Sequence, residues 1–271
     1  HLVNKRKNVK KSRLAECRGN ASGVLRELAT TWHREAQKTQ NQETYALAQM
    51  LYKEYLDNFP NVSDAYIMSF YYAELLFKLE KWQQAANAYT RVVKMKAGGK
   101  HLKEAAYAAV ISWKNALNVQ EEVKDTSRKK RRRRRGKKGK KDEEIVQKPR
   151  KISENQLKMM AAFDTYLKYV PKAKERITIM YRKARIYYEH NHYDRASKMF
   201  ADIAMTYPEH ELAVYAANLL LDSLNILKRY EELEQWVYKL LEKKQLAKGE
   251  LLATLLRLKR GIARKKLEQY Q

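Results

Sequence analysis

Aromatic and small residues recur along this chain at a fixed spacing. In the clearest form an aromatic residue is followed by alanine three positions later and by a second aromatic residue four positions after that, as in Tyr45, Ala48 and Tyr52. The pattern begins again at positions 82 and 193, with looser versions at 156 and 230, so the starts lie 37 residues apart, or twice 37 across the middle of the chain. Side chains with these spacings share one face of a helix. The pattern therefore predicts an all-α chain of repeated helical hairpins.

Hairpins of this length cannot bury their apolar stripe alone, so neighbouring hairpins must cover one another. We expect about five of them in a right-handed superhelical solenoid. The small residue, for example Ala196, lets the two helices of a hairpin approach closely, and we interpret the recurring aromatic residues as packing residues. Pro60, Pro171 and Pro208 each follow a second helix and should end it.

This order of residues resembles the tetratricopeptide repeat. The best match is carried by Ala184, Tyr193, Ala196, Phe200 and Pro208. The hairpin near Tyr230 departs from the consensus because Leu221 and Leu233 stand where small residues are expected. The resemblance covers about residues 24–245 and implies a helical-repeat fold.

Three stretches show a narrower resemblance. They read TTWHREAQKTQNQETYALAQMLYKEYLDNFP, YIMSFYYAELLFKLEKWQQAANAYTRVV and ELAVYAANLLLDSLNILKRYEELE. They are similar to a family of tetratricopeptide proteins from myxobacteria and related bacteria, several of which are linked to the cell envelope and gliding motility. The resemblance implies a scaffold in a periplasmic or envelope assembly, with no catalytic residues to carry over.

The tetratricopeptide resemblance also implies a concave groove, lined by first helices at the positions that flank the small packing residue. Carried over residue by residue, these positions are Phe70, Glu74, Phe77, Tyr107, Val110, Lys114, Tyr181, Arg185, Tyr188, Tyr215, Asn218, Asp222 and Asn225. Tyrosine offers contact area at low entropic cost, and asparagine can pair with peptide amides. We expect a protein segment to bind this groove; the alternative is that several of these residues pack against neighbouring helices.

One segment of the chain is strongly basic. Residues 124–151 carry +12 of the formal net charge of +26, and they should form a loop inserted in the third hairpin, between a helix at about 101–118 and a second helix that begins near Ile152. The densest part consists of Arg128, Lys129, Lys130, Arg131, Arg132, Arg133, Arg134, Arg135, Lys137, Lys138, Lys140 and Lys141. Like charges at this density repel one another, so we predict a disordered polybasic insertion.

Three interpretations of this basic tract remain open. It could be a solvated loop without a specific partner, a localisation signal, or a binding element for an anionic lipid, an acidic polysaccharide, nucleic acid or an acidic protein tail. Aromatic residues are not interleaved with the charges, so stacking platforms for bases are absent from the tract. The rest of the chain divides into a basic N-terminal extension over 1–23 and a solenoid over 24–271 that ends in a helix over 249–270.

No recognisable motif for catalysis, cofactor binding or a metal site occurs. His190 and His192 lack further ligands nearby in sequence, and AGGK at 97–100 predicts a turn rather than a phosphate-binding loop. The single cysteine, Cys17, follows glutamate and charged residues, which argues against lipidation. No apolar run is long enough to span a membrane.

The sequence therefore predicts a non-enzymatic scaffold or adaptor that binds protein partners through its groove, without a small-molecule substrate. The basic tract would add attachment to anionic surfaces. The alternative function is a polyanion-binding protein in which the tract is the functional element. The chain begins at His1, so we expect a fragment or a processed form. Localisation in the periplasm or cell envelope follows from the resemblance alone, and the cytoplasm is the alternative.

Overall fold

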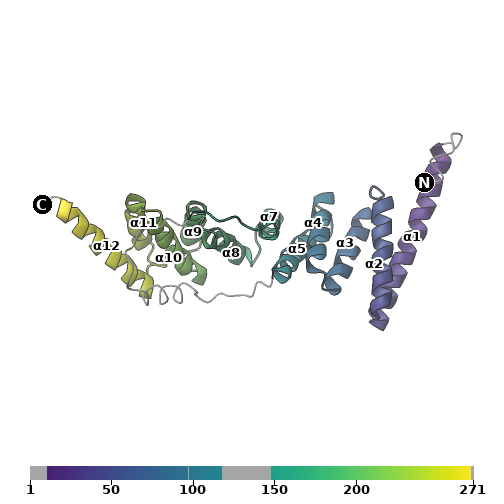
Figure 1. Ribbon diagram of the computed structural model, residues 1–271, viewed down its shortest axis with the longest axis horizontal. Helices are drawn as coiled ribbons and strands as arrows, with labels where there is room; N and C mark the ends of the chain where they lie inside the picture. Colours follow the sequence, from purple (N-terminus) through teal and green to yellow (C-terminus); the bar gives the residue numbers. More distant parts are fainter. Residues whose placement is uncertain (1–10, 97, 118–147, 270–271) are drawn as a thin grey trace. The chain divides into compact units, whose positions relative to one another are not determined.

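The computed structural model describes residues 11–96, 98–117 and 148–269, and within these ranges every regular element is an α-helix (Figure 1). In chain order the helices are α1 (Lys11–Thr39), α2 (Gln42–Asn58), α3 (Ala65–Lys78), α4 (Trp82–Met95), α5 (Leu102–Ala116), α7 (Glu154–Tyr169), α8 (Arg176–Glu189), α9 (Tyr193–Thr206), α10 (Glu211–Ile226), α11 (Tyr230–Glu242) and α12 (Gly249–Gln269). The prediction of an all-α chain of helical hairpins is confirmed.

The helices form two compact units. The first contains α1 to α5 and the last residues of α7, and the second contains the first part of α7 and α8 to α12. Within each unit, helices that are neighbours in sequence pack side by side, as the pairs α1/α2, α3/α4, α8/α9 and α10/α11 show. These pairs are the predicted hairpins. The two helices expected for the third hairpin are α5 and α7.

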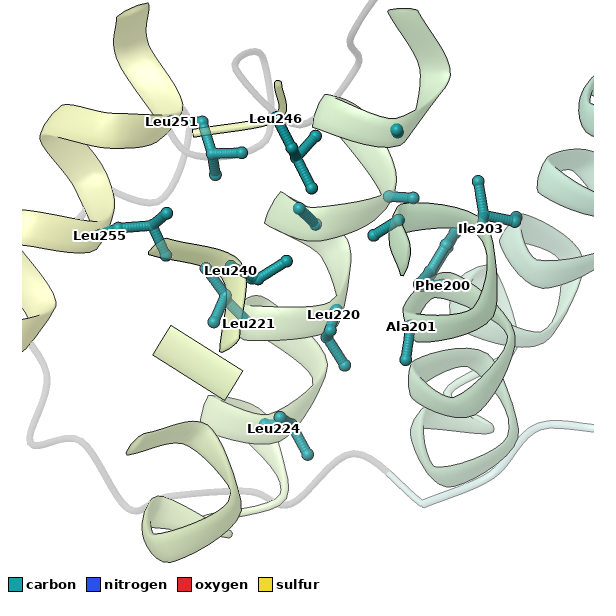
Figure 2. Packing of buried hydrophobic residues seen from close by; sticks show 14 of the residues in the cluster. Phe200, Ala201, Ile203, Leu220, Leu221, Leu224, Leu240, Leu246, Leu251 and Leu255 are labelled. Carbon is teal, nitrogen blue, oxygen red and sulfur yellow. The ribbon is translucent and has the colours of Figure 1, made fainter. Parts of the chain in front are cut away.

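The recurring aromatic residues form the cores of these hairpins. Tyr45, Tyr52, Tyr89 and Phe200 are almost fully buried, so their interpretation as packing residues is confirmed. Two aromatic residues at the first position of the motif are less buried: Trp82 is half-buried, and Tyr230, the first residue of α11, is 51% exposed. In the second unit the core continues from α9 to α12 (Figure 2). The labelled residues in that figure are Phe200, Ala201, Ile203, Leu220, Leu221, Leu224, Leu240, Leu246, Leu251 and Leu255.

Three of the turns between first and second helices share one backbone geometry. Glu80, Asn191 and Lys228 each have a positive φ, between 56° and 63°. In the first of these turns the Glu80 N–H donates to the carbonyl of Phe77 and the next N–H donates five residues back, to Leu76, both at 3.0 Å. Equivalent bonds occur at the other two turns. This is the Schellman arrangement, which satisfies carbonyl groups at the end of a helix.

The turn predicted at 97–100 lies between α4 and α5. Gly98 has a φ of 87° there. A Cβ on Gly99 would lie 2.4 Å from the hydroxyl oxygen of Tyr66, which also accepts the His101 N–H at 3.0 Å. The turn thus favours glycine at both positions, at Gly98 for its φ and at Gly99 for the close approach of the Tyr66 side chain.

The described structure revises the predicted N-terminal boundary and adds contacts at the end of the predicted loop. The boundary predicted after residue 23 falls inside α1, which continues from Lys11 without a break, and Arg18 donates to the carbonyl of Asn58 at the end of α2 at 3.3 Å. The segment predicted as a loop over 124–151 is held in place at its end. The Arg150 N–H donates to the His190 carbonyl at 2.8 Å, and Asn191 donates to the Lys148 carbonyl at 3.1 Å. The tract over 128–141 lies outside the described residues.

Candidate protein-binding faces

The predicted groove residues occupy repeated positions on the first helices. Positions 74, 185 and 222 are related by multiples of the 37-residue repeat, and so are positions 77, 114, 188 and 225. One position before 74, 185 and 222, and at the equivalent place in the third hairpin, the residue is buried in each case, whether it is small or not: Ala73, Val110, Ala184 and Leu221. The same repeat that builds the core therefore places the flanking residues on one side of the first helices.

In the second unit, two predicted groove residues contact each other. The Tyr188 hydroxyl on α8 donates a hydrogen bond to the Asp222 carboxylate on α10. One turn earlier on α8, Arg185 pairs with Glu189 at 2.6 Å. The Tyr188 bond joins two successive first helices, and the Arg185 pair fixes a charged group along α8.

The tyrosines of α8 rest on the core of their own hairpin. The Tyr181 ring lies 5.8 Å from that of Phe200, and the Tyr188 ring lies 5.3 Å from that of Tyr193, nearly perpendicular to it. Both tyrosines are half-buried. On α10, Tyr215 and Asp222 are half-buried and Asn218 and Asn225 are exposed. Aromatic rings with fixed positions therefore alternate with polar groups that reach the surface.

In the first unit some of the predicted groove residues are buried and others reach the surface. Phe70 is only 5% exposed, because the His101 imidazole stacks on it with 4.1 Å between ring centroids. This leaves Phe70 no surface for a partner, and we remove it from the candidate groove together with the buried Val110. Phe77 is half-buried, with its ring 5.0 Å from that of Trp82.

Glu74, Tyr107 and Lys114 remain at the surface of the first unit. Glu74 is exposed and accepts a hydrogen bond from the buried Tyr89 hydroxyl. Burial and the neighbouring Glu74 carboxylate raise the pKa of Tyr89, so this phenol stays a hydrogen-bond donor. Tyr107 is 39% exposed and its ring lies 5.5 Å from that of Tyr166, while Lys114 is half-buried.

The two histidines considered as metal ligands have structural contacts instead. His190 Nδ1 lies 2.9 Å from the carbonyl oxygen of Ile186, and His192 Nε2 lies 2.9 Å from that of Arg150. The His192 side chain therefore helps to hold the chain that enters α7 against the turn between α8 and α9, whereas the His190 side chain contacts the last turn of its own helix α8. Among the described residues, no three His, Cys, Asp or Glu side chains gather as metal ligands would.

Sequence reasoning missed two surface features of the first unit. Val24, Leu28 and Trp32 form an exposed stripe along α1, with Val24 67% exposed. Their spacing of four residues was visible in the sequence, but so were the buried positions Ala29 and Ala36 on the other side of the helix. The second feature is a cleft of about 540 Å³ lined by α2, α3 and α4. It carries no sequence signature because it depends on the distance between two second helices.

None of the helices in the described part of the chain combines the length and the apolar character that crossing a bilayer requires.

No protein-family model matches the sequence, and no curated protein matches it. Several solved structures are similar at low identity. One contains nearly identical TPR-like repeats from Podosopora anserina, with 12% identity, 90% of this chain and 98% of that chain covered, and a TM-score of 0.36. Another is a thermophilic TPR protein of Thermus thermophilus, with 12% identity, 87% of this chain and 99% of that chain covered, and a TM-score of 0.30.

A third similar structure is the TPR2AB domain of yeast Sti1 in complex with an HSP90 peptide, with 11% identity, 86% of this chain and 97% of that chain covered, and a TM-score of 0.29. The tetratricopeptide-like architecture of this chain rests on its own hairpins: paired helices, a 37-residue repeat, buried motif residues and shared turns.

Proposed function

We propose that this chain is a scaffold that binds a segment of a protein partner along the first-helix face of its second unit. We call this surface the α8–α10 face. It consists of Tyr181, Arg185, Tyr188, Tyr215, Asn218, Asp222 and Asn225. The observation that carries the proposal is the hydrogen bond from Tyr188 to Asp222, because it joins the two helices into one continuous surface.

The chemistry of the α8–α10 face suits a peptide of mixed polarity. Tyr181 and Tyr188 are half-buried and their ring positions are fixed by the core, so little side-chain entropy is lost on binding. Asn218 and Asn225 are exposed and carry both a donor and an acceptor, which match the main-chain groups of a peptide. Arg185 and Asp222 have opposite charge, so the face does not select a polyanion.

We extend the proposal to the first unit. Glu74, Phe77, Tyr107 and Lys114 occupy the matching positions of α3 and α5 and combine aromatic and charged groups in the same way. We treat this surface as a second candidate face, distinct from the α8–α10 face. Phe70 is buried and does not contribute to it.

A peptide selection tests the proposal. A displayed library of random peptides is selected against the full chain, and the affinity of one selected, labelled peptide is measured by fluorescence anisotropy. We expect the double variant Asn218→Ala/Asn225→Ala to bind this peptide with about tenfold lower affinity, because two amides on the proposed face are lost. Gln235→Ala, an exposed change on α11, is the matched control and should leave the affinity unchanged. Equal affinities for the double variant and the control would contradict the proposal.

The proposal also covers where in the cell the scaffold acts. It is supported here by the sequence resemblance to myxobacterial envelope and gliding-motility proteins. We propose that the scaffold serves an envelope assembly. Fractionation of the source cells with an antibody against the chain tests this, and recovery in the cytoplasmic fraction alone would contradict it.

The second candidate function, attachment to a polyanion, is supported by the charge of the tract over 128–141. Replacing Arg131 to Arg135 by serine should weaken binding to heparin and flatten its dependence on salt, because fewer counterions are released. An unchanged salt dependence would contradict a role for these arginines.

A further inference from the structure

The cleft in the first unit lies between the second helices of two successive hairpins, whereas the α8–α10 face is formed by first helices. Its walls come from the second helices α2 and α4, and its floor comes from α3. We propose that this cleft binds an acidic peptide segment whose carboxylate side chains reach between Lys53 on α2 and Arg91 on α4. The residues involved differ from those of the α8–α10 face, so this proposal and the proposed function can fail independently.

Charge gives the first argument. Lys53 and Arg91 stand on opposite walls of the cleft, and neither forms an ion pair within the described ranges 11–96, 98–117 and 148–269. None of the residues that line the cleft carries a carboxylate. Asp57 lies near enough to contribute to the raised pKa of Tyr72, which is due mainly to burial. Two cations without carboxylate partners across a cleft attract an anionic group.

A buried hydroxyl in the floor gives the second argument. Ser69 is 2% exposed, lines the cleft, and its hydroxyl has no hydrogen-bond partner among the described residues. Two other buried serines, Ser112 and Ser223, donate to the carbonyl four residues earlier, at 2.7 and 2.6 Å. Leaving a buried hydroxyl without a partner costs about 1–3 kcal/mol, so the presence of serine at this position needs an explanation.

The repeat shows that serine is not needed at this position for packing. The residues one and four repeats further along the chain are Ala106 and Ala217, and both are buried. Alanine therefore meets the packing requirement of the position in other hairpins. The Ser69 hydroxyl is the feature that distinguishes this hairpin, and a small displacement of the side chains around it on binding would let a carboxylate or a peptide carbonyl in the cleft become its partner.

The remaining polar groups suit an elongated ligand. Gln49 is fixed by a hydrogen bond from Lys81. Gln84 and Asn87 lie one turn apart on α4 and offer further amides. A second cleft, of about 350 Å³, adjoins the first along α4 and shares Asn87 and Arg91 with it. Amides on two walls of a cleft that extends along α4 match the main chain of a peptide better than a compact metabolite.

The test uses the full chain and two labelled peptides, one with glutamate alternating with serine and one with glutamine in place of glutamate. Fluorescence anisotropy at physiological ionic strength gives their affinities. We expect Lys53→Gln/Arg91→Gln to lower the affinity for the glutamate peptide by about tenfold. Ser69→Ala, which changes no charge, should weaken it by about threefold. The matched control Lys244→Gln/Arg257→Gln removes two exposed cations elsewhere and should change the affinity by less than about twofold.

The control separates recognition from the general attraction of an acidic peptide to a basic protein. Equal losses in the two double variants, or a glutamine peptide that binds as tightly as the glutamate peptide, would overturn the proposal. Unchanged affinity of Ser69→Ala would also overturn it. Thermal melts check the fold, and we expect Ser69→Ala to melt no lower than the wild type because it removes an unpaired buried hydroxyl.

Discussion

The hydroxyl of Tyr188 on α8 donates a hydrogen bond to the carboxylate of Asp222 on α10. Both residues belong to first helices of successive hairpins, so this bond connects neighbouring repeats on the face that we propose for partner binding. It makes the face a property of the repeat array rather than of one hairpin.

Tyr188→Phe removes this bond and should lower the free energy of unfolding by about 1 kcal/mol, because the half-buried carboxylate loses a donor. Chemical denaturation measures the change. Tyr215→Phe removes a hydroxyl from the same face with no hydrogen bond to it among the described contacts, and it should have almost no effect. Equal effects of the two variants would show that the Tyr188 bond does not stabilise the fold.

Ala196→Leu should lower the free energy of unfolding by about 1–3 kcal/mol through overpacking. Ala196 is fully buried on α9, and the Tyr188 ring packs close to its helical neighbours Tyr193 and Phe200, which leaves no room for a larger side chain. A thermal melt detects the change. Lys198→Leu, at an exposed position of the same helix, should stay within about 0.5 kcal/mol of the wild type. A melt of Ala196→Leu that matches the wild type would contradict the packing described for α8 and α9.

Glu80→Gly should stabilise the chain by up to about 1 kcal/mol. Glu80 has a φ of 56°, a region that side chains with a Cβ adopt at a cost and glycine adopts readily. Denaturant titration gives the sign. Gln235→Gly, in the exposed interior of α11, is the matched control and should be destabilising by about 1 kcal/mol. Destabilisation by both variants would mean that the turn does not strain Glu80.

His33 should make the stability of the first unit depend on pH. Its ring is buried between α1 and α2, with Nδ1 3.1 Å from the Tyr52 hydroxyl, and burial lowers its pKa below the ordinary 6.5. The unfolded chain therefore binds more protons than the native state once the pH falls below about 6.5, and stability should decline as the pH falls through that range.

The denaturation midpoint measured from about pH 7.5 down to about pH 5.5 should therefore fall more steeply for the wild type than for His33→Gln, which cannot be protonated. Other titrating groups contribute equally to both proteins. Parallel curves would show that His33 is not protonated differently in the two states.

The sequence alone was sufficient to predict the hairpins and much of their cores. A strict repeat of 37 residues constrains which positions face inward, so Tyr52, Tyr89 and Phe200 could be assigned to the core before their neighbours were known. Tyr230 follows the same motif but is 51% exposed, whereas Tyr193, which is also the first residue of its helix, is buried. A residue pattern predicts a helical face and does not predict how far the packing extends along it.

The candidate site was harder to predict because some of the contacts that decide the exposure of its residues come from the next hairpin. Phe70 and Tyr107 occupy equivalent positions, yet His101 stacks on Phe70 while Tyr107 stays 39% exposed. Nothing within the repeat distinguishes the two residues. The contacts of Lys148 and Arg150 with the turn between α8 and α9 were missed for the same reason, since their charges indicated a solvated loop.

The proposed face is tested most directly by crosslinking from the face itself. A photo-reactive amino acid replaces Asn218 in one variant and Gln235 in another, both at exposed positions of the second unit. Each variant is irradiated with the peptide selected against the wild-type chain, and mass spectrometry measures the crosslinked fraction. The account predicts a crosslink from position 218 that excess unlabelled peptide abolishes, and none from position 235. A crosslink from position 235 with none from position 218 would contradict it.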